Sequence, residues 1–286
     1  ALKMICDREN EITSFIPEEY WTITADYGDN FTALLSKYKG KDIRIKNSFD
    51  AENIEKEIKS GKFTVESVKT GKRKPKTYAP FTTSSMQQDA SIKLNFQTKK
   101  TMQIAQQLYE GIDVKGIGTR GLITYLRTDS VRIATVAKEA AASYITDKFG
   151  KEYSSDNSFS NKNKDIQDAH EAIRPTDVTL EPEAIRESLT ADQFKLYNLV
   201  WTRFVASQMS AAEFDTVSVT IDNNDYKFRA SGSRMVFDGW RKVYPISNEK
   251  DSFVPELNEG DELKCKDIIK EQKFTQPPAR YTEAGI

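Results

Sequence analysis

The order in which two hydrophobic patterns follow one another constrains the fold of this chain more than any other feature. Alternating apolar and polar residues, which are typical of β-strands, occur between residues 20 and 78 and return after residue 216. The long stretch between them repeats its apolar residues at helical spacing instead. Strands on both sides of a helical block indicate one β-rich domain into which a helical domain is inserted. We therefore expect a discontinuous α+β fold, in which the β-rich part forms an arch and the helical part its tip.

Short alternating runs predict the strands of the β-rich part. These runs are Trp21–Thr24, Asp42–Ile45 and Phe63–Val68 before the helical block, and Val217–Ile221 and Tyr226–Ala230 after it, with a turn over 222–225. A small helix is predicted over 50–60. The basic stretch 69–76 carries five cations around Pro75. We favour a solvated linker for it over a dedicated DNA contact.

Helical spacing predicts four helices in the inserted part. They begin at Thr83 or Ser84, at Thr98, at Thr135 and after Thr190; the second ends at Gly111. Ser84 with Gln87, and Ser85 with Gln88, have the spacing of capping boxes, whereas Ala134 leaves the third helix without a capping side chain. The first two helices, followed by a strand that carries Tyr125, suggest a winged helix-turn-helix that binds DNA. A further helix is predicted over 2–15, and a loop over 153–164.

Composition excludes several classes of protein. Forty-two basic and forty-three acidic side chains give a net charge of -1 and a pI near 6.1, so any nucleic-acid site requires a local concentration of positive charge. The two cysteines, Cys6 and Cys265, lie far apart without a CxxC partner, which argues against a disulfide framework and a zinc site. No apolar run approaches the length of a membrane span, and we expect no signal peptide. The expected compartment is the cytoplasm.

The stretch Gly121–Ser130, GLITYLRTDS, carries the strongest chemical signal. Interpreted as a strand, it places Ile123, Tyr125 and Arg127 on one face. A free phenol has a pKa of about 10 and needs help from its surroundings to act as a nucleophile at neutral pH. Arg127 can stabilise a phenolate and can also bind a phosphate with two parallel hydrogen bonds. Because most tyrosines are packing residues, this pattern alone leaves both interpretations of Tyr125 open.

The one histidine of the chain opens the string His170-Glu171-Ala172-Ile173-Arg174. The string resembles the zinc motif HExxH, but Arg174 replaces the second histidine, so a zinc site has lost a ligand. If the segment is helical, His170 and Arg174 share one face. A lone histidine is more often structural than catalytic. The residues alone therefore leave the role of His170 open.

Five motifs resemble those of type IA DNA topoisomerases, and they follow the order of that family. They are FTTSSMQQDA at 81–90, ITYLRTDS at 123–130, QDAHEAIRPTD at 167–177, FDGW at 237–240 and PPARYTEA at 277–284, so the motifs are spread over the chain from residue 81 to residue 284. The resemblance implies an ATP-independent isomerase that relaxes negatively supercoiled DNA by transient single-strand cleavage. Leu126 and the string over 171–174 are more similar to the bacterial topoisomerase I branch than to topoisomerase III.

The resemblance implies roles for individual residues. Tyr125 becomes covalently joined to a 5′ phosphate, Arg127 stabilises the charge, and His170 lies near the cleaved phosphate. Asp129 and Glu171 support this site, and Arg174 contacts DNA. The predicted helix-turn-helix adds phosphate contacts from three lysines, although an ordinary solvated helix face would explain each of them as well. These lysines are Lys93, Lys99 and Lys100.

The resemblance also implies partners and surroundings. Mg²⁺ would be held by an acidic Toprim module that has no counterpart in this sequence, so we expect no metal ligands here, and no GxxxxGK[ST] loop for ATP occurs. We expect a central piece of a longer monomeric enzyme that binds single-stranded or negatively supercoiled DNA and does not relax it alone. Its predicted parts are a gate base at 1–18 and 271–286, a β-rich arch at 19–78 and 206–270, and the helical catalytic-tyrosine domain at 79–205.

Three alternatives stay open. Tyrosine recombinases and type IB enzymes also join a tyrosine to DNA, but families of that kind place an HxxR box before a late tyrosine, whereas here Tyr125 comes first and the spacing is HxxxR. A non-catalytic module that binds single-stranded DNA would use Tyr125 only to stack on bases. A topoisomerase III-like decatenase would share the motifs and act on a different DNA topology.

Overall fold

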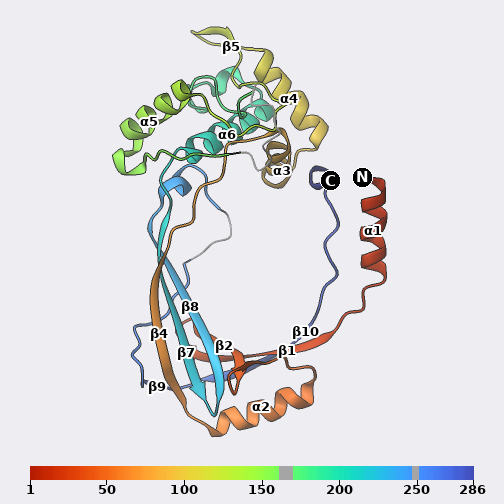
Figure 1. Ribbon diagram of the computed structural model, residues 1–286, viewed down its shortest axis with the longest axis vertical. Coiled ribbons are helices and arrows are strands. Elements are labelled where there is room, and N and C mark those ends of the chain that lie inside the picture. Colours follow the sequence, from red (N-terminus) through yellow and green to blue (C-terminus); the bar gives the residue numbers. More distant parts are fainter. Residues whose placement is uncertain (161–169, 247–250) are drawn as a thin grey trace. The chain divides into compact units, whose positions relative to one another are not determined.

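The computed structural model describes residues 1–160, 170–246 and 251–286 as an α+β protein with two compact units (Figure 1). Unit 1 combines Ala1–Arg73, Glu213–Val236 and Asn248–Arg280. Unit 2 combines Lys74–Ala212, Phe237–Ser247 and Tyr281–Ile286. The chain thus leaves unit 1 after Arg73, builds most of unit 2, and returns. The separate gate segments at 1–18 and 271–286 stay a prediction.

An antiparallel sheet forms the body of unit 1. Its strand order is β10-β1-β2-β8-β7-β4-β9, and β3 pairs with β2. The strands are β1 (Glu19–Gly28), β2 (Phe31–Tyr38), β3 (Lys41–Asp42), β4 (Phe63–Arg73), β7 (Glu213–Asn223), β8 (Tyr226–Phe237), β9 (Glu262–Leu263) and β10 (Asp267–Phe274). The register of β1 and β10 runs from Glu19 opposite Phe274 to Asp26 opposite Asp267. Segments from near the two ends of the sequence therefore share one ladder.

Tight turns join consecutive strands of this sheet. Asn224 and Asp225, between β7 and β8, have φ values of 52° and 67°, and Asp29 and Asn30, between β1 and β2, have 52° and 62°. Asparagine and aspartate tolerate this left-handed conformation better than most residues with a side chain. The predicted turn over 222–225 is confirmed in its second half, residues 224–225, since β7 ends at Asn223 and β8 begins at Tyr226.

Two strand boundaries in unit 1 differ from those predicted. The basic segment 69–73 is not a linker, because β4 continues through it and pairs with β7, from Lys69 opposite Ser218 to Arg73 opposite Phe214. The ladder holds this segment extended despite its charge. The predicted run 42–45 is a strand only at its first residue, and Ile45 reaches the sheet through an isolated bridge to Trp21.

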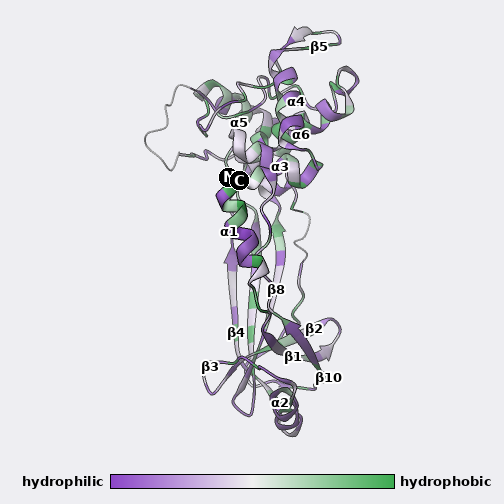
Figure 2. Cartoon of the chain, turned by 90° about the vertical axis from the view of Figure 1, so that its right-hand side faces the viewer, coloured by the Kyte–Doolittle hydropathy of each residue, from purple (hydrophilic) through white to green (hydrophobic). Residues whose placement is uncertain are grey.

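Two helices belong to unit 1. Helix α2 (Ser48–Ser60) begins where the side chain of Asn47 accepts a hydrogen bond from the Asp50 N–H, and it buries Ala51 and Ile58 against the sheet. Helix α1 (Leu2–Thr13) ends two residues before the predicted end and buries none of its residues. Both hydrophilic and hydrophobic residues occur along α1 in Figure 2. None of the helices in the described ranges has the length and apolar character needed to cross a membrane.

Unit 2 is mainly helical. Its elements are α3 (Thr83–Leu94), α4 (Thr98–Glu110), the hairpin β5 (Ile112–Val114) and β6 (Gly118–Arg120), α5 (Thr135–Phe149), α6 (Ala191–Ser207), and the 3₁₀ turns η1 (Lys151–Tyr153), η2 (Arg186–Ser188), η3 (Gly239–Lys242) and η4 (Glu283–Gly285). The four predicted helices are therefore confirmed to within a residue or two. The winged helix-turn-helix remains a proposal, since the hairpin follows α4 but Tyr125 lies beyond it.

Helix α6 forms the centre of the unit 2 core. A capping box opens the helix, with both hydrogen bonds between Thr190 and Gln193. Tyr197 and Trp201 are buried, and their polar atoms donate to the carbonyl oxygens of Leu180 and Val178 at 2.8 and 2.9 Å. Buried aromatic rings with satisfied polar atoms are core residues. The aromatic stripe of α6 therefore packs the unit.

The caps of α3 and α5 differ in how well the sequence predicted them. The box that opens α3 pairs Thr82 with Ser85, so the predicted boxes at Ser84 and Ser85 are wrong. Thr82 has the extended backbone of an N-cap residue, and the serine takes the place usually held by glutamate or glutamine. Ala134 is the N-cap residue of α5, and its side chain makes no capping hydrogen bond.

The FDGW string fastens together segments of unit 2 that lie far apart in sequence. The Trp240 ring is buried, and its Nε1–H donates to the Pro75 carbonyl oxygen at 3.0 Å. The Trp240 N–H donates to the Ser210 carbonyl oxygen at 3.0 Å. Gly239 has φ 51°, and a Cβ there would lie 2.6 Å from the carbonyl oxygens of Ser210 and Ala211. The motif therefore needs its glycine for this close approach.

Candidate active site

Tyr125 presents an exposed aromatic ring on unit 2. The side chain is 37% exposed. Its ring centroid lies 5.0 Å from that of His170, with the planes 37° apart, and 5.7 Å from that of Tyr109, with the planes 69° apart. His170 is exposed as well. The structure thus brings together two of the predicted site residues that are distant in sequence.

The backbone that carries Tyr125 is not a β-strand, so that prediction is wrong. Between 121 and 130 one isolated bridge joins Ile123 to Pro175. Neighbouring residues of a strand lie on opposite faces, so a half-exposed strand buries only one of the two. Leu122 and Ile123 are both buried. Exposed and buried side chains alternate only from Tyr125 onward. Tyr125, Arg127 and Asp129 are exposed, and Leu126, Thr128 and Ser130 are buried.

The hydroxyl of Thr124 fixes this segment to the HEAIRPTD motif. Thr124 Oγ1 donates to the Ala172 carbonyl oxygen at 2.7 Å and accepts from the Arg174 N–H at 3.0 Å. The Thr124 N–H donates to the Arg174 carbonyl oxygen at 2.9 Å, and the Thr176 N–H donates to that of Leu122 at 3.0 Å. The two motifs therefore position each other through backbone and hydroxyl contacts.

Thr83, the first residue of α3, fixes the other side of the segment. Its Oγ1 donates to the Leu126 carbonyl oxygen at 2.7 Å and accepts from the Thr128 N–H at 2.9 Å. The Thr83 N–H donates to the Thr128 carbonyl oxygen at 2.9 Å. Arg127, between these two anchored residues, is exposed, and no ion pair within the described part of the chain engages it. Its guanidinium is available to an anion.

Tyr109, near the end of α4, is a neighbour of Tyr125 that the sequence did not reveal. Its carbonyl oxygen would lie only 2.5 Å from a Cβ at position 121, so Gly121 allows the chain to pass this close to α4. The Leu122 N–H completes the contact by donating to the Leu108 carbonyl oxygen at 2.7 Å. Helical spacing predicts that Tyr109 belongs to α4. It does not predict that the irregular segment with Tyr125 packs against the end of this helix.

The segment that follows His170 is not helical, so the shared helical face proposed for His170 and Arg174 is wrong. Its backbone is extended instead: the Ala172 N–H donates to the Arg132 carbonyl oxygen and the Ile173 N–H to that of Phe81, both at 2.8 Å. These bonds satisfy buried backbone groups that a helix would have paired internally. The preceding residues of the motif, 167–169, lie outside the described residues.

Glu171 and Arg174 pair with each other. The Arg174 Nε lies 2.7 Å from Glu171 Oε2, and Nη1 donates to the Pro175 carbonyl oxygen at 3.0 Å. The Arg174 side chain is only 13% exposed. The Glu171 carboxylate therefore holds the Arg174 side chain in position. A DNA contact from Arg174 stays a prediction.

The three predicted phosphate-binding lysines have different surroundings. Lys93 lies 3.2 Å from the Tyr244 ring centroid and 3.6 Å from Asp89 Oδ2, and burial lowers the pKa of its ammonium. Lys100 pairs with Asp192 at 2.8 Å. Lys99 is exposed and takes part in no ion pair within the described ranges. Of the three, Lys99 is therefore the most available to a phosphate.

The Mg²⁺ that the resemblance implies does not fit the described residues. Across them, no group of three or more histidine, cysteine, aspartate or glutamate side chains could hold a metal ion. Glu171 is engaged by Arg174, which leaves Asp129 as a single exposed carboxylate in the site. Mg²⁺ in proteins usually takes one or two carboxylates together with substrate phosphates. Any resident metal would need ligands from other residues.

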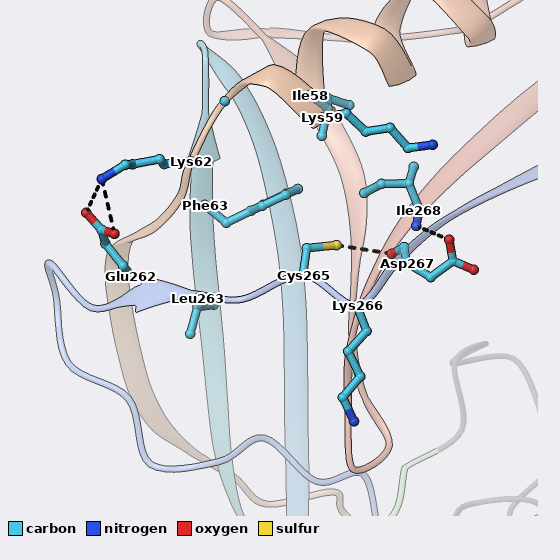
Figure 3. A pocket seen from close by; sticks show the side chains of 11 residues that line it. Ile58, Lys59, Lys62, Phe63, Glu262, Leu263, Cys265, Lys266, Asp267 and Ile268 are labelled. Carbon is cyan, nitrogen blue, oxygen red and sulfur yellow. Dashed lines mark hydrogen bonds and ion pairs between the residues drawn. The ribbon is translucent and has the colours of Figure 1, made fainter.

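A pocket of about 440 Å³ in unit 1 lies between α2, β4 and β10 (Figure 3). Two of its three lysines are engaged, since Lys62 pairs with Glu262 at 3.1 Å and Lys59 with Glu55 at 2.7 Å, while Lys266 is the third. The Cys265 thiol donates to the Asp267 carbonyl oxygen at 3.1 Å, and burial raises its pKa. None of the predicted site residues lines this pocket. It therefore offers no nucleophile for the predicted chemistry.

Comparisons with known proteins match the whole chain. A family model described as DNA topoisomerase covers residues 1–286. Among solved structures, full-length topoisomerase I from Thermotoga maritima is similar, with a TM-score of 0.85 and 39% sequence identity. The similarity covers 99% of this chain and 45% of that chain. The chain thus spans less than half the length of this relative.

Proposed function

This chain belongs to the type IA DNA topoisomerase family, and from that premise we propose that it provides the nucleophile and its immediate partners for transient cleavage of one DNA strand. Tyr125 is the nucleophile. The observation that carries the proposal is the exposed Tyr125 ring, in contact with the His170 imidazole and two residues from the exposed Arg127 guanidinium. A buried packing tyrosine would not present its ring to solvent between such groups.

The proposed step is a transesterification. The Tyr125 phenolic oxygen forms a bond to the phosphorus of a phosphodiester, and the bond from phosphorus to the 3′ oxygen breaks. The phenolic proton leaves as the bond forms, and the departing 3′ oxygen takes up a proton to become a hydroxyl. Attack of that hydroxyl on the phosphotyrosine reverses the step. Because one phosphodiester replaces another, religation requires no ATP.

Arg127 and His170 would act on charge and on the proton, respectively. Phosphoryl transfer depends mainly on positioning and on stabilisation of the phosphate charge. The Arg127 guanidinium can bind a non-bridging oxygen through paired N–H donors. The His170 ring lies beside the phenol, and the imidazole would assist the transfer of the phenolic proton. Asp129 and Glu171 support the site, and Arg174 with the lysines of α3 and α4 would contact the strand.

The activity of the whole protein is a wider proposal. We infer relaxation of negatively supercoiled DNA by cleavage, strand passage and religation, with Mg²⁺ supplying charge neutralisation at the phosphate when bound, in a protein that acts as a monomer. The described residues offer no metal site, and the chain spans 45% of its full-length relative. This chain alone is therefore expected not to relax a supercoiled plasmid, with or without Mg²⁺. Tyr125-dependent relaxation by the isolated chain would contradict that expectation.

Denaturant trapping of a covalent adduct tests the nucleophile. In the full-length protein, Tyr125→Phe is expected to abolish the 5′-linked DNA adduct and to keep single-strand affinity within a few-fold, because only one oxygen is removed. Tyr109→Phe is the matched control and should keep the adduct. An adduct that persists in Tyr125→Phe, mapped by mass spectrometry to another residue, would overturn the assignment.

The same assay separates the role of Arg127 from packing. Arg127→Ala is expected to slow cleavage by roughly a hundredfold or more, which corresponds to about 3 kcal/mol of lost charge stabilisation. Arg127→Lys should recover part of the rate, because it restores the charge without the paired donors. If no variant forms an adduct while DNA binding is normal, the chain is a non-catalytic single-strand-binding module. Preference for catenanes over supercoiled plasmid would indicate a decatenase.

A further inference from the structure

The second half of strand β4 has a strand partner on one side only. Pairing with β7 continues to Arg73, whereas pairing with β9 stops at Phe63 and Thr64. In the described chain no strand pairs with the second side of residues 69–73, and all five of them are exposed. This segment lies at the edge of the ribbon that β4 forms with β7 and β8 (Figure 1). Residues 69–73 are therefore an open sheet edge.

One face of the open edge carries positive charge. Residues that are an even number of positions apart lie on the same face of a strand, so Lys69 and Arg73 share one. Their ladder partners are Ser218 and Phe214, and Cζ of Arg73 lies 4.4 Å from the centre of the Phe214 ring. Lys69 is exposed and takes part in no ion pair within the described ranges. Its ammonium is therefore available to a carboxylate on a neighbouring strand.

The other face of the open edge borders a cavity of about 620 Å³. Thr70 and Lys72 line it on β4, and Val217 lines it on β7. The segment 252–254 also contributes to the lining, and Phe253 within it is 64% exposed. An exposed phenyl ring beside a cavity gains free energy when an apolar group covers it. This face therefore suits apolar side chains, whereas the opposite face suits acidic ones.

The backbone of the open edge favours a peptide as its partner. The N–H and C=O groups on the free side of an edge strand need partners, and another extended chain satisfies them along its whole length. A second copy of this chain would bring Lys69 and Arg73 near the same two residues, and like charges across a ladder are destabilising. The charge of the open edge therefore disfavours self-pairing and favours an acidic strand.

A nucleic acid matches the open edge less well. Lys72 lies opposite Asp215 in the ladder, and Asp215 Oδ2 lies 3.9 Å from Arg234 Nη2 on the next strand. The carboxylate between these two cations would repel a phosphate. A phosphodiester backbone also has no donors for the free C=O groups of β4, which a peptide backbone supplies. The partner that fits both the backbone and the side chains of this edge is therefore a peptide.

We propose that the open edge docks an extended segment of a partner protein by strand addition, and that acidic and large apolar residues alternate along this segment. The added strand would lie about 4.8 Å from β4. Its acidic side chains would face Lys69 and Arg73, and its apolar side chains would reach the cavity beside Thr70. Main-chain hydrogen bonds would supply affinity, and the alternating side chains would supply specificity. The inference stands apart from the proposed reaction, to which none of these residues is assigned.

Binding of a synthetic peptide to the full-length protein tests the alternation. The probe is a capped, fluorescently labelled peptide of about seven residues in which aspartate and leucine alternate, long enough to pair along the edge. The control peptide has the same residues arranged in two blocks, one of aspartate and one of leucine. Fluorescence anisotropy should show that the alternating peptide binds about tenfold more tightly or better. Equal affinities would overturn the proposal, because attraction by charge alone does not depend on the order of the residues.

Hydrogen exchange locates the bound peptide. The amide hydrogens of 69–73 that do not pair with β7 should exchange rapidly in the free full-length protein and slowly with the alternating peptide bound. Protection that appears only in other segments would overturn the proposal. Slow exchange of these amides without the peptide would also overturn it, because another part of the full-length protein would then cover the edge.

Charge reversal on the open edge tests its polarity. Lys69→Glu should weaken binding of the alternating aspartate peptide about tenfold, and it should bind a peptide with lysine in place of aspartate more tightly than the wild type does. Lys41→Glu is the matched control, because Lys41 is an exposed lysine of β3, which pairs with β2 and not with β4. Equal weakening by the two variants would assign the effect to net charge and overturn the proposal. Unchanged urea midpoints confirm that both variants are folded.

A single-stranded oligonucleotide separates a peptide site from a DNA contact. Lys69→Glu should keep the oligonucleotide affinity within about twofold of the wild type, because no phosphate contact is removed, and it should still form the Tyr125 adduct. Tyr125→Phe should lose the adduct and bind the alternating peptide as the wild type does. If the oligonucleotide displaces the peptide and Lys69→Glu weakens both to the same extent, the open edge is a DNA contact and the proposal is overturned.

Discussion

The ring centroids of Tyr125 and His170 lie 5.0 Å apart, with their planes tilted by 37°. The two residues belong to segments that different hydroxyl groups hold in place. Thr83 fixes the backbone on either side of Arg127, and Thr124 fixes the segment that follows His170. The position of the Tyr125 ring relative to the His170 imidazole therefore depends on two threonines that take no part in the proposed reaction.

Replacement of His170 tests whether its ring nitrogens or its packing matter. His170→Phe keeps an aromatic ring beside Tyr125 and removes both nitrogens. If the imidazole assists proton transfer, this variant lowers the single-turnover cleavage rate about a hundredfold at pH 7, and His170→Ala lowers it by a similar factor. A wild-type rate in His170→Phe together with a slow His170→Ala would show that the ring only packs against the phenol.

Removal of the Thr124 hydroxyl is expected to destabilise unit 2 and to slow cleavage. Thr124→Val keeps the shape of the side chain but leaves the Ala172 carbonyl oxygen and the Arg174 N–H with fewer partners. The expected loss is about 2 kcal/mol in the free energy of unfolding, measured by urea denaturation. Thr124→Ser retains the hydroxyl and should stay within about 0.5 kcal/mol of the wild type. Equal stability of the valine and serine variants would contradict this role.

A capping side chain at position 134 is expected to stabilise the protein. Ala134 has the extended backbone of an N-cap residue, φ -61° and ψ 145°, and its side chain makes no capping hydrogen bond. Ala134→Ser or Ala134→Asp should therefore raise the free energy of unfolding by about 1 kcal/mol. Ala140→Ser, on the exposed face within the same helix, is the control and should lower stability slightly, because serine is a poorer helix former than alanine.

Acid is expected to weaken unit 1 through Glu55. Hydrogen bonds from Lys270 and Lys59, at 2.5 and 2.7 Å, hold the pKa of its carboxyl below the usual value of 4.5. A carboxyl whose pKa is lower in the folded state stabilises the fold above its unfolded pKa, and this contribution is lost as the pH falls below 4.5 through the folded pKa. Glu55→Gln should be less stable at pH 7 and should show a shallower loss between pH 5 and pH 3 on urea denaturation at each pH. Parallel pH profiles for the two proteins would contradict the linkage.

Periodicity predicted the regular elements well, because helices and β-ladders impose their spacing on the sequence. The buried face of α6 and the turn at Asn224 are examples in which local pattern and final structure agree. The linker predicted at 69–73 from its positive charge is wrong, because this basic segment belongs to β4 and pairs with β7. Pairing between distant segments overrides the local preference for solvent, and a single sequence does not show it.

The chemistry of the candidate site was visible in the sequence, but its geometry was not. The type of residue and the motif resemblance pointed to Tyr125, Arg127 and His170. The contact with Tyr109, the irregular backbone around Tyr125 and the extended segment after His170 all depend on contacts between segments far apart in the chain. Short-range spacing cannot predict such contacts, because irregular backbone has no period.

The pairing of β1 with β10 sets the order in which a growing chain completes unit 1. Strand β1 precedes the other strands of this sheet in the sequence, and one of its edges pairs with β2 soon after both are made. Its other edge stays without a partner until residues 267–274 have been synthesised, by which time the whole of Lys74–Ala212 has intervened. An open strand edge is a template for wrong pairing. Translation through these residues therefore exposes unit 1 to aggregation for longer than unit 2.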